Sequence, residues 1–71
     1  MGTQSRRLRR WNVRLRQVEP GRWTCADFDA ELEPRWQRWR VSRRTKHGVL
    51  DIGTAPSLAD AEELIRREVE P

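Results

Sequence analysis

Arginine and tryptophan side chains are concentrated in the first two thirds of this 71-residue sequence. Residues 1–46 contain 13 Lys or Arg and 5 Asp or Glu, a net charge of +8, whereas residues 47–71 contain 2 basic and 6 acidic residues, a net charge of −4. All but one of the 15 basic residues are Arg, which donates planar, bidentate hydrogen bonds to phosphates and base edges. Three of the four Trp (Trp11, Trp36 and Trp39) lie among these arginines. The pattern predicts binding to a polyanion.

Other kinds of chemistry have little support in the sequence. Cys25 and His47 are the single residues of their types and lie far apart, so no metal-ligand spacing exists and we expect no metal or cofactor. There is no nucleophile–His arrangement and no Gly-rich phosphate loop, which predicts a protein that is not an enzyme. A lone Cys cannot form an internal disulfide, and no apolar stretch suits a signal peptide or a membrane span. These features predict a cytoplasmic location and no membrane partner.

Alternating apolar and polar residues predict a first strand over Trp11–Val18. The same residues also fit a basic amphipathic helix, because Leu8, Trp11, Leu15 and Val18 recur at helical spacing. The strand is favoured because a Pro-Gly turn follows directly, and a second β-like run, Trp23–Phe28, comes after it.

An even-numbered loop between these two runs sets the register of the hairpin. It places Leu15 opposite Ala26 on one face, and Arg14 opposite Asp27 on the other.

The remaining elements follow from the same patterns. Asp29–Pro34 is polar and is interpreted as a connection, Trp36–Arg43 as a third strand and Val49–Ile52 as a short fourth strand. Ser57, followed three residues later by Asp60, is typical of a helix N-terminus. The apolar stripe of the helix that follows consists of Leu58, Ala61, Leu64, Ile65 and Val69.

Together these elements predict an α+β domain over residues 11–70, preceded by a basic flexible tail at residues 1–10. Its architecture is a small antiparallel sheet of three to four strands with one C-terminal helix packed on one face. The exposed edges of so small a sheet are compatible with a homodimer. The residues expected beneath the helix are Val13, Leu15, Phe28, Trp39, Val41, Leu50 and Ile52.

The opposite face of the sheet is the predicted binding surface. It should carry Arg14, Arg16, Arg38 and Arg40, with Trp36 and Trp23 beside them. A small β-ribbon fits the DNA major groove, so duplex DNA is the favoured partner. Phosphate contacts are expected from the tail arginines Arg6, Arg7, Arg9 and Arg10, and from Arg43, Arg44 and Lys46. Trp and Arg are also enriched at protein interfaces, so a protein-interaction module is the alternative.

Several strands are followed by a motif that opens the helix, Gly53-Thr54-x-x-Ser57-Leu58-Ala59-Asp60-Ala61-Glu62. This order of elements resembles the arm-type DNA-binding domain at the N-terminus of tyrosine integrases. The pattern is also similar to AP2-type domains. The resemblance implies a helix-backed sheet placed in the major groove, with DNA read by Arg14, Arg16, Trp36, Arg38 and Arg40. The Arg-rich, Lys-poor composition also resembles that of short proteins of actinobacteria and their phages, which keeps open a factor that binds a host protein.

Overall fold

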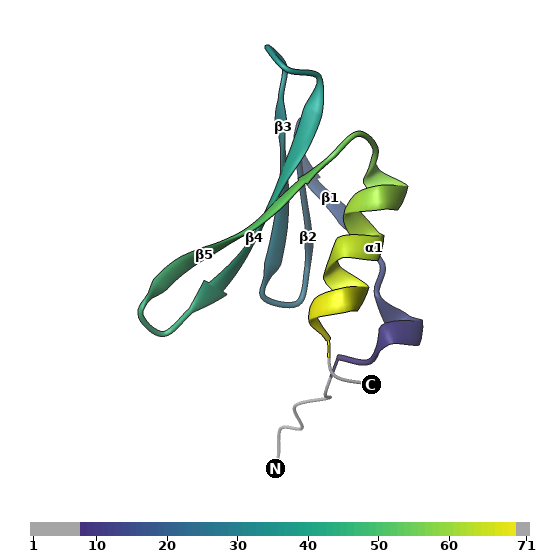
Figure 1. Ribbon diagram of the computed structural model, residues 1–71, viewed down its shortest axis with the longest axis vertical. Helices are drawn as coiled ribbons and strands as arrows, with labels where there is room; N and C mark the ends of the chain where they lie inside the picture. The colour runs from purple at the N-terminus through teal and green to yellow at the C-terminus, as the bar shows by residue number, and fades with distance from the viewer. Residues whose placement is uncertain (1–7, 70–71) are drawn as a thin grey trace.

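Five strands, each joined to the next by a short turn, form one antiparallel sheet in the order β1-β2-β3-β4-β5 (Figure 1). The computed structural model describes residues 8–69. A single α-helix, α1, follows the sheet and covers one of its faces. The α+β class with a C-terminal helix is confirmed, whereas the predicted strand count of three to four is wrong and is corrected to five. The strands are β1 (Arg16–Glu19), β2 (Arg22–Cys25), β3 (Phe28–Glu33), β4 (Arg38–Thr45) and β5 (Gly48–Ala55).

Strand β3 covers Asp29–Glu33 of the segment Asp29–Pro34, so the prediction of a connection there is wrong. The chain reverses directly after β2 in a two-residue turn, where Ala26 adopts a left-handed φ of 54°. Apolar residues then alternate with Asp29, Glu31 and Glu33 along β3. These carboxylates depress the intrinsic strand preference of the segment. Basic residues on the neighbouring strand offset this low preference, because each carboxylate gains a cross-strand partner of opposite charge, as where Glu31 faces Arg40 of β4.

The segment before β1 also differs from the predicted strand over Trp11–Val18 and from the alternative helix. Arg10–Asn12 form one short 3₁₀ turn, η1, and β1 begins only at Arg16. A β-bulge between Gln17 and Glu19 shifts the register, so that Arg16 faces Thr24. The predicted pairs of Leu15 with Ala26 and of Arg14 with Asp27 are therefore wrong.

The bulge in β1 determines on which face Trp23 lies and leaves Val18 without a partner in the β1–β2 hairpin. Trp23 faces Gln17, is half-buried and packs against the core beneath α1, whereas the prediction placed it on the open face. Val18 is the extra residue of the bulge and is 56% exposed.

Helix α1 (Leu58–Glu68) begins where the sequence predicts. The Ser57 hydroxyl oxygen accepts a hydrogen bond of 3.1 Å from the Asp60 backbone N–H, which confirms the N-cap. Ala61 and Ile65 are fully buried against the sheet. The buried core consists of Val13, Leu15, Cys25, Phe28, Ala30, Val41, Ala55, Ala61 and Ile65.

Three members of the predicted core lie differently from the rest. Trp39 and Ile52 are half-buried, and Leu50 is 53% exposed. Leu50 is exposed because the β4–β5 hairpin runs past α1, toward the lower left of Figure 1.

The residues before β1 are held against the helix. The Leu15 backbone N–H donates to the Glu62 carboxylate at 2.8 Å, and Arg10 Nε donates to the Arg66 carbonyl oxygen at 3.4 Å. Leu8 packs on the edge of the core. The predicted basic tail lies mostly in residues 1–7, outside the described residues. In residues 8–69, no helix has the length and apolar character required to cross a membrane.

Candidate nucleic-acid interface

The face of the sheet opposite α1 carries arginines and carboxylates in equal number. The register and the alternation of side chains place five arginines there: Arg16, Arg22, Arg38, Arg40 and Arg44. The same rule places five carboxylates there: Glu19, Asp29, Glu31, Glu33 and Asp51. This open face is therefore close to neutral, although it is rich in arginine.

Glu33 is shared between two of the arginines predicted to contact DNA. Arg38 Nε lies 2.6 Å from Glu33 Oε1, and Arg40 Nε lies 2.8 Å from Glu33 Oε2. Arg40 Nη1 also lies 2.9 Å from the Asp51 carboxylate. The hydrogen bonds from Arg38 and Arg40 lower the pKa of Glu33, and the hydrogen bond to Glu33 raises the pKa of Arg40. Both guanidinium groups are thus engaged with carboxylates of the same molecule.

Arg43 and Arg44 hold the β2–β3 turn against β4. Arg43 lies on the side of α1, with its guanidinium carbon 5.0 Å from the centre of the Phe28 ring and its Nε 3.1 Å from Asp27. Arg44 pairs with Asp29 at 3.0 Å and donates to the Ala26 carbonyl oxygen at 2.7 Å. These contacts give both arginines a structural role within the fold.

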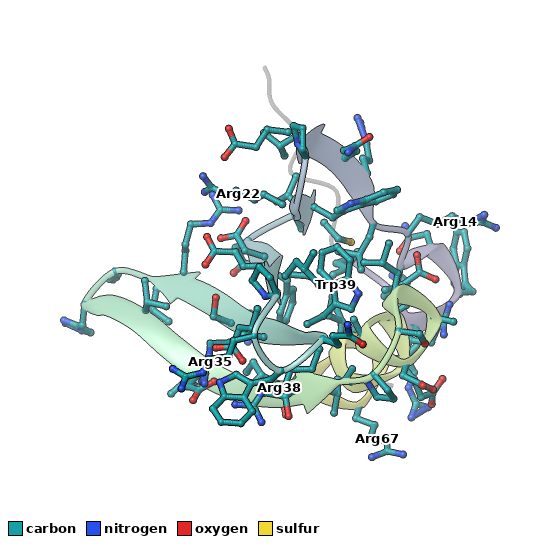
Figure 2. All side chains as sticks on the ribbon, turned by 90° about the horizontal axis from the view of Figure 1, so that it is seen from above. Arg14, Arg22, Arg35, Arg38, Trp39 and Arg67 are labelled. Atoms are coloured by element: carbon teal, nitrogen blue, oxygen red, sulfur yellow. The ribbon has the colours of Figure 1, made fainter. Side chains whose placement is uncertain are left out.

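Trp36 is exposed in the turn between β3 and β4. Its side chain is 59% exposed, and the guanidinium carbons of Arg35 and Arg38 lie 5.3 and 5.4 Å from the centre of its ring. Figure 2 shows Arg35 and Arg38 beside each other, with Arg14 at the opposite periphery of the molecule. Trp36 therefore lies where the sequence predicts an exposed aromatic, but apart from Arg14.

The N-terminal arginine segment, residues 9–16, has a different electrostatic character. Within residues 8–69, none of its four arginines (Arg9, Arg10, Arg14 and Arg16) has a carboxylate oxygen within 4.0 Å, the limit that defines an ion pair. Trp11 is 77% exposed in the middle of the segment. Together with Arg10, Glu63 and Arg66 it lines a shallow pocket beside α1. The segment combines uncompensated positive charge with an accessible aromatic ring.

The predicted site residues thus divide into two groups. Arg14 and Arg16 belong to the N-terminal arginine segment and keep their charge available to a ligand. Arg38, Arg40, Arg43 and Arg44 are paired within the sheet. The exposure of Trp11 was missed, because strand alternation placed its side chain on the core face.

The described residues form no cluster suited to a metal ion. Within residues 8–69, no group of three or more His, Cys, Asp or Glu is arranged to hold a metal ion, and Cys25 is buried. Comparisons of the chain with protein-family models, with curated proteins and with solved structures found no match. The case for a ligand therefore depends on the charge and exposure of this chain's own side chains.

Proposed function

We propose that this protein is a non-enzymatic DNA-binding domain and that the N-terminal arginine segment contacts the phosphates. The observation that supports this proposal is the run of four arginines that flank the exposed Trp11 along the chain and have no ion-pair partner within residues 8–69. Phosphate contacts from arginine dominate the affinity of proteins for nucleic acids.

The open face of the sheet is the weaker candidate for these contacts. A phosphate that approaches Arg38 or Arg40 has to displace the carboxylate of Glu33. It also meets repulsion from Glu31 and Asp51 on the same face. The carboxylates beside the N-terminal arginine segment, Glu62 and Glu63 of α1, pair with Arg66 and not with the arginines of the segment.

Duplex DNA is favoured over a single strand because of the distribution of the exposed aromatic rings. Proteins that bind single strands stack successive bases on neighbouring aromatic side chains. Here the two most exposed Trp lie far apart: Trp11 in η1, in the purple part of the chain, and Trp36 in the turn between β3 and β4 at the other end of Figure 1. A duplex requires only that phosphates meet the arginines.

The test compares two matched double variants in binding to a short labelled duplex. Arg14→Gln/Arg16→Gln removes two unpaired charges from the N-terminal arginine segment, and Arg38→Gln/Arg40→Gln removes two charges of the open face that are paired with Glu33. We expect the first variant to lose affinity and the second to bind as the wild type does, with circular dichroism confirming that both are folded. The reverse order would return the interface to the open face of the sheet, and absence of binding by the wild type at low salt would reject the proposal.

A further inference from the structure

The two edges of the sheet differ in how well they are protected from pairing with another strand. Strand β1 has four residues, a bulge at Val18 and a proline directly after its end, all of which discourage edge pairing. Strand β5 has eight residues, and Gly48–Asp51 are all exposed. Its bulge lies further along, at Ile52, so Val49–Asp51 form a regular stretch of strand on the projecting hairpin, directly after Gly48, whose φ of 133° closes the turn.

This exposed stretch of β5 is apolar on both faces. Val49 is 71% exposed and lies on the open face, opposite Arg44 in the register. Leu50 is 53% exposed and lies on the face of α1, opposite Arg43. Alternate residues of an edge strand also direct their backbone N–H and C=O groups outward, which makes such an edge a template for a further strand.

We propose that β5 pairs with β5 of a second copy of this chain, antiparallel and about a two-fold axis at Val49, to give one continuous sheet across the dimer. In this register the two Val49 side chains lie opposite each other on the open face. Each Leu50 lies opposite Gly48 of the other copy, where a Cβ would meet no atom within 4 Å, so the Leu50 side chain has room there. The two Val49 side chains then cover each other.

Charge complementarity favours a second copy as the occupant. The two-fold axis at Val49 brings Asp51 of one copy to the hairpin end of the other, where the turn carries Lys46 and His47. The Asp51 side chain is 62% exposed and holds Arg40 of its own chain through Oδ2 alone, and within residues 8–69 Lys46 has no carboxylate oxygen within the 4.0 Å ion-pair limit. The pairing therefore forms two equivalent contacts between opposite charges, one at each end of the paired strands.

The dimer should form in a concentration-dependent way. One pair of short strands buries less than the ~1,200 Å² of a standard stable interface, so the association is of the weak, reversible class. It is independent of the nucleic-acid proposal, because it uses the hairpin end of the sheet and none of the four arginines of the N-terminal segment.

The test is sedimentation equilibrium over a series of protein concentrations, with Val49→Lys as the variant and Val18→Lys as the matched control on the other edge. Both side chains are exposed, so neither substitution disturbs the core. We expect the mass of the wild type and of Val18→Lys to rise toward twice that of the monomer, and Val49→Lys to stay monomeric. A wild type that is monomeric at every concentration, or a dimer lost only in Val18→Lys, would overturn the proposal.

A charge reversal at Lys46 tests the register and leaves the Arg40–Asp51 ion pair of each chain intact. Lys46→Asp should weaken the dimer more than the neutral control Lys46→Gln, because it brings like charges together at each end of the paired strands. If Lys46→Asp associates as strongly as Lys46→Gln, the two-fold axis at Val49 is wrong.

Discussion

The steepness with which DNA affinity falls with salt should report the number of arginines that contact phosphates. Each phosphate contact contributes about −0.9 to the slope of log affinity against log salt. The four arginines of the N-terminal segment therefore predict a slope of about −3.6, which amounts to a loss of about 150-fold between about 50 and 200 mM salt. Removing two of them should reduce the slope to about −1.8 and the loss to about 12-fold.

The assay is a fluorescence-anisotropy titration of a labelled duplex at several salt concentrations. Arg6 and Arg7 precede the segment and can add contacts of their own, so the quantity to test is the difference in slope between two proteins. Arg14→Gln/Arg16→Gln should differ from the wild type by about 1.8. Arg38→Gln/Arg40→Gln should keep the wild-type slope, because its arginines are already paired with carboxylates.

Two results would refute this reasoning. If the slope falls by the same amount in both double variants, the internal ion pairs do not withhold arginines from DNA. If only Arg38→Gln/Arg40→Gln has the shallower slope, the open face of the sheet is the interface.

The remaining predictions concern stability. Ile65→Ala should lower the free energy of unfolding by about 2–5 kcal/mol in urea denaturation, because the side chain is fully buried; a smaller loss would mean that α1 is loosely packed. Ser57→Ala should cost about 1 kcal/mol in the same assay, through loss of the hydrogen bond from Asp60, and no loss would contradict the N-cap. Ala26→Gly should raise the free energy of unfolding by about 0.5–1 kcal/mol by relieving the left-handed φ of 54°, whereas a decrease would place the strain elsewhere. The pKa of Glu33 is lowered by its two arginine partners, so its contribution to stability is present above its ordinary pKa of 4.5 and is lost as the pH falls through the lowered folded-state value. The difference in melting temperature between the wild type and Glu33→Gln should accordingly shrink from pH 7 to strongly acidic pH, and a difference that grows would reverse the sign of this linkage.

The parts of the fold that local sequence determines are the parts that could be predicted. The N-cap at Ser57 and the apolar stripe of α1 depend on residues within a few positions of one another. Strand β4 and the middle of β5 follow from alternation along one strand. Strand β3 could not be predicted in this way, because its acidic residues resemble a loop until the arginines of β4 are placed opposite them.

The prediction of the candidate site was incomplete for the same reason, because strand β3 was not predicted. The exposure and positive charge of Arg14 and Arg16 follow from their own positions. The pairing of Arg38 and Arg40 with Glu33 depends on β3, so without that strand both arginines were predicted to contact a ligand. A signal for this pairing is present in the sequence: Glu31-Leu32-Glu33 and Arg38-Trp39-Arg40 flank a four-residue turn as two mirrored motifs of opposite charge.

Mirrored charges of this kind explain why a high arginine content does not by itself define a binding surface. The planar fork of arginine suits a carboxylate as well as it suits a phosphate, so an arginine placed beside Glu or Asp is satisfied within the fold. Of the five arginines on the open face, Arg22, Arg38, Arg40 and Arg44 have such a partner on a neighbouring strand, and Arg16 is the exception. The charge available to a polyanion is the part that the fold leaves unpaired. Among residues 8–69 this charge is greatest in the N-terminal arginine segment, because the neighbouring carboxylates of Glu62 and Glu63 pair with Arg66.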